Sequence, residues 1–125
     1  MTYIGRFAPS PTGPLHFGSL ITAVASYCDA KANQGTWLVR IEDTDIPRIY
    51  PNSESHILDC IDAFEFEPDA DIIFQKNRLD LYEEVLEQLK QAQQIYACEC
   101  TRKQLGSNHI YVGTCRDLHL DFLNQ

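Results

Sequence analysis

The chain has 125 residues, of which 44% are hydrophobic and 22% are charged, and its formal net charge is −8. This length and composition suit one soluble globular domain with its own core. No stretch reaches the roughly 18 apolar residues that a membrane span requires, so we expect no membrane partner. The acidic balance argues against a free-standing nucleic-acid binder, although a local basic patch can still contact RNA. No signal peptide opens the chain and its five cysteines are an odd number, which favours a cytoplasmic protein without disulfides.

The organising stretch is residues 4–20. Residues 4–7 predict a buried strand, residues 8–13 turn the chain with two prolines and a glycine, and a helix begins between Leu15 and Ser19. A strand, a rigid loop and a helix N-terminus in this order present backbone N–H groups to a phosphate. Neither GxGxxG nor GxxxxGK[ST] occurs, and His16 instead places an imidazole at the start of the helix. Gly18 leaves an open backbone surface against which a flat ring can pack. A solvated proline-rich ligand segment is the alternative.

The first helix is expected to end near Asn33, with Gly35 as the glycine that stops it. Its inner face is expected to carry Leu20, Ile21, Val24, Ala25, Cys28 and Ala32. Residues 37–41 predict a second buried strand, parallel to the first, which completes a right-handed βαβ unit.

An acidic turn, residues 42–45, follows this second strand. Ligands of open α/β sheets bind beyond the carboxyl ends of the strands, so Arg6 and Glu42 are candidates to face one crevice. A solvated acidic turn is the alternative interpretation.

Two further helices and a short strand are expected downstream. A helix from Asn52 or Ser53 to about Phe64 should bury Ile57, Leu58, Ile61 and Phe64. Residues 72–74 predict a short strand, and residues 78–93 predict a helix with apolar side chains at Leu79, Tyr82, Val85, Leu86 and Leu89. Cys28 and Cys60 are expected to be buried, inert thiols, and His56 a packing or surface residue.

Three cysteines bracket one polar loop near the end of the chain: Cys98, Cys100 and Cys115. They supply three soft ligands, and zinc prefers four in a tetrahedron. The fourth ligand must come from His109, Tyr111 or His119, and chemistry alone favours a histidine. Reduced cysteines without a metal are the alternative.

The run RFAPSPTGPLHFGS, followed by VRIEDTD, resembles the glutamate-specific branch of the class I aminoacyl-tRNA synthetases, whose first signature is the HIGH motif. The resemblance covers residues 3–118. It implies the N-terminal half of a Rossmann-like α/β catalytic domain over residues 1–94, and a small zinc-binding module over residues 95–125. It also implies activation of glutamate with ATP and Mg²⁺, and tRNA as a partner.

The resemblance also assigns roles to residues. His16 and Gly18 are the implied catalytic residues, and the implied ATP contacts are Pro9, Gly13, His16 and Gly18. The implied glutamate contacts are Arg6, Phe7, Ala8, Pro9, Ser10 and Glu42. The Cys-x-Cys pair with a later Tyr-x₃-Cys is similar to the zinc module of glutamyl-queuosine tRNA(Asp) synthetases. That likeness implies zinc ligation by Cys98, Cys100, Tyr111 and Cys115, and tRNA(Asp) as the partner.

The sequence departs from the family pattern in two ways. Ser19 replaces the second histidine of HIGH, a change that we expect to be harmless. The late lysine loop, KMSKS, and the second half of the sheet are missing. We therefore expect the N-terminal part of such an enzyme, folded but inactive alone, and able to self-associate through an exposed sheet edge. The alternatives are an N-terminal fragment of a glutamyl-tRNA synthetase and a zinc-stabilised, non-catalytic remnant.

Overall fold

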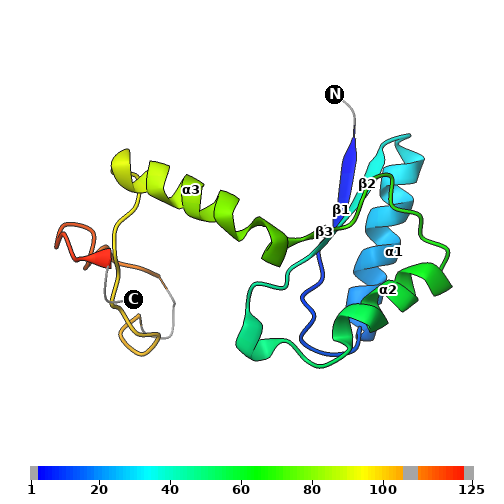
Figure 1. Cartoon of the computed structure of the whole chain (residues 1–125), viewed down its shortest axis with the longest axis horizontal. Helices are drawn as coiled ribbons and strands as arrows, with labels where there is room; N and C mark the ends of the chain where they lie inside the picture. The colour runs from blue at the N-terminus through cyan, green and yellow to red at the C-terminus, as the bar shows by residue number, and fades with distance from the viewer. Residues whose placement is uncertain (1–2, 106–109, 123–125) are drawn as a thin grey trace. The chain divides into compact units, whose positions relative to one another are not determined.

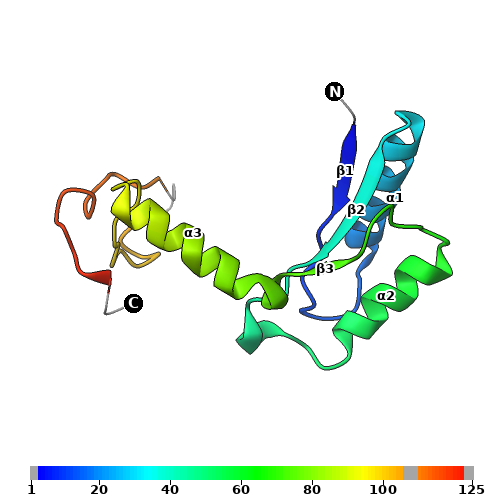
Figure 2. The same cartoon turned by 45° about the horizontal axis from the view of Figure 1, so that its top comes forward.

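The computed structural model describes residues 3–105 and 110–122. The chain divides into two compact units, Met1–Leu79 and Asp80–Gln125. The first unit holds a parallel three-stranded sheet in the order β1-β2-β3, formed by β1 (Ile4–Phe7), β2 (Thr36–Ile41) and β3 (Ile73–Phe74). Its helices are α1 (Phe17–Ala32) and α2 (Ser53–Ala63), and both lie on the same side of the sheet in Figures 1 and 2. The α/β class with parallel strands is confirmed.

Helix α3 (Leu79–Gln91) opens the second unit, and none of its residues is buried. The irregular segment that carries the three clustered cysteines follows it. The expected boundary after residue 94, between the catalytic half-domain and the zinc-binding module, stays a prediction. Across the described residues, no helix combines the length and the hydropathy that crossing a membrane would need.

The core of the first unit lies between the helices and one face of the sheet. Trp37, Val39 and Ile41 alternate along β2, and each is at most 1% exposed. The rest of the core comes from the other elements of this unit, namely Phe7, Ala23, Ala30, Ile57 and Ile61. Because successive strand residues point to opposite faces, the intervening side chains of β2 lie on the other face, which is exposed or half-buried. Arg6, a predicted site residue on β1, lies on this second face, whereas Phe7 is buried in the core.

The predicted inner face of α1 is wrong. The buried residues of α1 are Ala23 and Ala30, whereas Ile21 is 51% exposed and Val24 is 38% exposed. A Cβ atom on Gly5 would lie only 2.9 Å from the Cβ of Ala30, so the helix packs too closely on β1 for a large side chain. Small residues therefore face the sheet, and the larger apolar ones point away. Cys28 is exposed for the same reason, which contradicts the expectation of a buried thiol.

The end of α1 also differs from the prediction. Gln34, not Gly35, takes the left-handed conformation, with φ of 51°. Gln34 N donates to the carbonyl of Lys31 at 3.0 Å and Gly35 N to that of Ala30 at 2.8 Å, the pattern of a Schellman motif. Gly35 is required for a different reason, because a Cβ there would lie 2.4 Å from the carbonyl oxygen of Tyr3.

Helix α2 buries Ile57 and Ile61 as predicted, but Phe64 is 49% exposed. Phe64 ends the helix, and Phe66 turns inward instead, with its ring centroid 4.8 Å from that of Tyr27. Phe66 therefore occupies the inward-facing position that was expected for Phe64. Cys60 is half-buried.

Candidate functional site

The loop between β1 and α1 is held by the segment that follows β2. Pro9 and Pro11 are buried, and their carbonyl oxygens accept hydrogen bonds at 2.9 Å from the backbone N–H groups of Glu42 and Tyr50, respectively. The buried Ser53 hydroxyl lies 2.5 Å from the Pro11 carbonyl oxygen and 2.6 Å from that of Tyr50, and it donates to one of them at a time. The loop is thus pinned at two carbonyl groups.

A cavity of about 420 Å³ lies between this loop and the first turn of α1. Six residues that the resemblance assigns to ATP or glutamate are in its wall: Phe7, Ala8, Pro9, Ser10, Gly13 and His16. Arg6, Gly18 and Glu42 are not among its lining residues. The sequence interpretation overlooked the hydroxyl groups of Thr12, Ser19 and Thr22, which also line it. Thr12 lies within the RFAPSPTG run and Ser19 within HFGS, so the motifs carried a signal for both.

His16 is the N-cap of α1. Its Nδ1 accepts a hydrogen bond from the Ser19 backbone N–H at 3.2 Å, which satisfies one of the free donors of the first turn. A neutral imidazole whose Nδ1 accepts carries its proton on Nε2. In that tautomer the His16 ring donates from Nε2, which lies 3.3 Å from the Ser19 hydroxyl oxygen at the positive end of the helix dipole.

Gly18 lies against the His16 ring. A Cβ at Gly18 would lie 3.2 Å from both Cε1 and Nδ1 of that ring, closer than ordinary van der Waals contact. A side chain at position 18 would therefore crowd the His16 ring and disturb its hydrogen bond with the Ser19 backbone N–H. This gives Gly18 a role within the motif in addition to the ring-packing surface predicted from the sequence.

Arg6 and Glu42 lie on the same face of the sheet. Arg6 pairs with Leu38 in the parallel register, and Arg40 and Glu42 follow Leu38 by two and four residues. The rise of a strand separates the levels of Arg6 and Glu42 by about 13 Å, a span that two long side chains and a small substrate can fill. Their assignment to glutamate stays a prediction.

The structure adds an ion pair and a buried carboxylate around Glu42 that sequence reasoning missed. Arg40 NH2 lies 2.6 Å from Glu42 Oε1. Asp43 is 1% exposed, and its Oδ1 accepts a hydrogen bond at 2.8 Å from the backbone N–H of Lys76. Lys76 Nζ lies 3.3 Å from Asp43 Oδ2, outside hydrogen-bond geometry, and 2.8 Å from Glu54 Oε2. Hydrogen bonding to Glu54 raises the pKa of Lys76, so the lysine stays charged.

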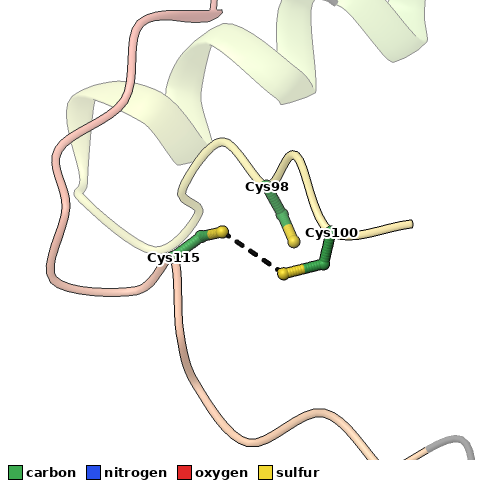
Figure 3. Close-up of side chains that lie close together, drawn as sticks. All are labelled: Cys98, Cys100 and Cys115. Atoms are coloured by element: carbon green, nitrogen blue, oxygen red, sulfur yellow. Dashed lines mark hydrogen bonds between the residues drawn. The ribbon is translucent and has the colours of Figure 1, made fainter. Parts of the chain in front are cut away.

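The three sulfur atoms of Cys98, Cys100 and Cys115 gather at one point, within 4.8 Å of one another (Figure 3). The sulfurs of Cys100 and Cys115 are 3.5 Å apart. Two thiolates bound to one tetrahedral zinc at 2.3 Å lie about 3.8 Å apart, so the spacing fits that ion. Hydrogen bonding with the neighbouring Cys115 sulfur raises the pKa of Cys100 to about 12. A bound cation would reverse this shift by stabilising the thiolates.

Tyr111 is the oxygen candidate nearest to these thiols in sequence. Its hydroxyl oxygen accepts a hydrogen bond at 2.7 Å from the backbone N–H of Cys115. The cluster of possible ligand atoms found among the described residues does not include His119. His109 lies outside the described residues, so its candidacy is unaffected.

Residues 4–111 match the family model described as tRNA synthetases class I (E and Q), catalytic domain. That range contains β1, the pinned loop, His16 and the strand end at Glu42. The chain belongs to this family. The resemblance drawn from RFAPSPTG and VRIEDTD is confirmed, together with the class I catalytic fold.

The curated relatives that carry the name Glutamyl-Q tRNA(Asp) synthetase include proteins from Acinetobacter baylyi and Dechloromonas aromatica. The protein from Acinetobacter baylyi is 76% identical over 123 residues, which are 98% of this chain and 42% of the relative. The protein from Dechloromonas aromatica is 50% identical over 123 residues, covering 91% of this chain and 41% of the relative. The chain spans about two fifths of the length of these relatives and corresponds to their N-terminal part.

The solved structures with a similar fold include two from Elizabethkingia species. A glutamate tRNA ligase from Elizabethkingia meningosepticum, in complex with its amino acid, has a TM-score of 0.69 at 33% identity. A glutamate-tRNA synthetase from Elizabethkingia anophelis has a TM-score of 0.70 at 34% identity. Each match covers 84% of this chain and less than a quarter of the solved chain.

Proposed function

We propose that this chain forms the ATP- and glutamate-binding part of a cytoplasmic enzyme that activates glutamate and transfers it to queuosine in tRNA(Asp). The observation that carries the proposal is the 76% identity to the Acinetobacter baylyi relative across 98% of the chain. The pinned loop, the cavity and the His16 cap supply a site of the right kind.

The reaction requires alignment more than acid–base chemistry. An oxygen of the glutamate α-carboxylate attacks the α-phosphorus of ATP, a P–O bond to the β-phosphate breaks, and pyrophosphate leaves with the bonding electron pair. The nucleophile is already ionised, so no general base is needed. The protein must instead hold both substrates in line and stabilise charge that develops on the phosphate oxygens.

Residues of the cavity and of the neighbouring strand ends are suited to these tasks. His16 Nε2–H and the first turn of α1 can donate to phosphate oxygens. Ser10 and the Arg6 guanidinium can receive a carboxylate, and Glu42 can receive the substrate ammonium. Mg²⁺, when bound with ATP, would neutralise charge on the phosphates.

A second candidate function, an N-terminal fragment of a glutamyl-tRNA synthetase, is favoured by the two solved structures. Tyr111 and Cys115 argue against this candidate, because the Tyr-x₃-Cys pattern resembles the queuosine branch. Glutamyl-tRNA synthetases that bind zinc in this region resemble one another in a more distant Cys-x-His, and Cys115 is followed by Arg116 and Asp117 instead. A zinc-stabilised, non-catalytic remnant of such an enzyme is the third candidate.

The proposal is tested with a chimera that joins residues 1–125 to the remaining part of the Acinetobacter baylyi relative. We expect glutamate-dependent exchange of pyrophosphate into ATP without tRNA. We also expect transfer of labelled glutamate to tRNA(Asp) that contains queuosine, and none to unmodified tRNA(Asp) or to tRNA(Glu). Charging of tRNA(Glu) would support the second candidate, and absence of exchange would support the remnant.

The metal is a separate prediction. We expect one zinc per chain, bound by Cys98, Cys100, Cys115 and Tyr111. The prediction is supported by the three sulfur atoms, which lie within 4.8 Å of one another, close enough to bind one tetrahedral ion. Elemental analysis of protein purified without chelators measures this ratio. Tyr111→Phe should lose zinc to a competing chelator at least about tenfold more readily, as expected when a closed site loses a ligand.

The matched controls are His109→Ala and His119→Ala, which remove the competing candidates. Both should retain zinc like the unaltered chain. Zinc loss in either, with retention in Tyr111→Phe, would assign the fourth ligand to that histidine. A ratio near zero in the unaltered chain would reject the metal site altogether.

A further inference from the structure

Arg40 lies on β2 two residues before Glu42, on the face of the sheet that also carries Arg6. Its NH2 group contacts one oxygen of Glu42, Oε1, at 2.6 Å. Within the described part of the chain, no hydrogen bond or ion pair engages the second oxygen, Oε2. Glu42 is therefore held at one oxygen and free at the other.

The Arg40 side chain lowers the stability of the folded chain at one of its nitrogen atoms. Its Nε is buried and has no hydrogen-bond acceptor among the described residues. An unsatisfied buried N–H group destabilises the folded state, and an apolar side chain of similar length would avoid that cost. The Arg40–Glu42 pair is about one-third exposed, and ion pairs of this exposure contribute little to stability. Fold stability alone does not account for an arginine at this position.

We propose that Arg40 is a positioning residue for Glu42. By fixing Oε1, it restricts the rotamers of the Glu42 side chain and presents Oε2 to the substrate ammonium. Without Arg40, binding would have to order this side chain at its own entropic cost. The inference rests on the proposed function, because it assumes that Glu42 receives the ammonium of glutamate.

Arg40→Met in the chimera tests the proposal. The KM for glutamate in pyrophosphate exchange should rise about tenfold, the scale expected when a substrate contact loses its orientation. The KM for ATP should not change. The thermal midpoint of the 125-residue chain should not fall, because methionine relieves the unsatisfied Nε. Arg40→Lys keeps a cation near Glu42 and should restore part of the affinity.

Two further measurements separate positioning from a general structural defect. Glutarate has both carboxylates of glutamate but no ammonium, so its inhibition constant should be the same for Arg40→Met and the unaltered chimera. In a Glu42→Gln background, Arg40→Met should have no further effect on the KM for glutamate. Lys31→Met is the matched control, because Lys31 forms a similarly exposed pair with Asp69, which accepts a hydrogen bond from Trp37 N near the start of β2.

The outcomes distinguish this inference from the proposed function. An unaltered chimera without glutamate-dependent exchange overturns the proposed function. An active chimera in which Arg40→Met leaves the KM for glutamate unchanged overturns only the role of Arg40. Equal weakening of glutamate and glutarate, together with a lower thermal midpoint, assigns Arg40 to the fold and also overturns the inference.

Discussion

Arg6→Ala in the chimera is expected to weaken glutamate binding by about 2–5 kcal/mol, the range for truncating one partner of a desolvated charge pair. This corresponds to a rise of roughly 30- to 4,000-fold in the KM for glutamate, at 1.4 kcal/mol per factor of ten. The physical reason is that a guanidinium offers a forked donor to a carboxylate, and alanine offers none. Arg6 is exposed on β1, so the fold should tolerate the change.

Steady-state pyrophosphate exchange at varied glutamate and varied ATP measures the effect. Lys31→Met is again a suitable control, since it removes a cation from a helix on the other face of the sheet. A normal KM for glutamate with a raised KM for ATP would assign Arg6 to ATP binding instead. Normal values for both would remove Arg6 from the site.

The 125-residue chain by itself is expected to catalyse pyrophosphate exchange at least roughly a hundredfold more slowly than the chimera, the scale for losing one preorganised charge contact. The reason is that residues 1–125 contain no KMSKS-like lysine loop to stabilise the α-phosphate during adenylyl transfer. His16, Gly18, Arg6 and Glu42 are all present, so weak binding of ATP and glutamate should persist and can be measured by calorimetry. Comparable rates in the chain and the chimera would contradict this prediction.

The isolated chain should also self-associate. Strand β1 is at one edge of the described sheet, and apolar side chains of α1 such as Ile21 and Val24 are exposed. Such surfaces favour association between copies. Sedimentation at increasing concentration should show a mass above that of the monomer for the chain, and a monomeric mass for the chimera. A monomeric mass for the chain at every concentration would reject the expectation.

Local sequence determined the elements and the family. The bounds of β1 were predictable because a short apolar run meets a proline, and β2 because a run of branched and aromatic residues follows a helix end. RFAPSPTG and VRIEDTD identified the family by resemblance. In the structure the two runs also contact each other, because the Glu42 backbone N–H donates to the Pro9 carbonyl. The Cys-x-Cys spacing similarly predicted a gathering of thiols, since local chain geometry already brings two of them together.

Only the tertiary structure decided which side of α1 faces the sheet. Helical periodicity points to the stripe with the largest apolar residues, but the close approach of Gly5 to Ala30 admits only small ones. The same holds for Gly35, whose role depends on the carbonyl of Tyr3 more than thirty residues earlier in the chain. Contacts between distant segments are not encoded in a local pattern.

The contacts around Glu42 and Asp43 were likewise not predicted from the sequence. The pairing of buried Asp43 with Lys76 depends on where β3 ends relative to β2. The contact of Arg40 with one oxygen of Glu42 depends on both side chains sharing the open face at the end of a strand. Strand alternation already places Arg40 and Glu42 on one face. The partner of Asp43, by contrast, is set by strand register and by burial, which arise only when the sheet is assembled.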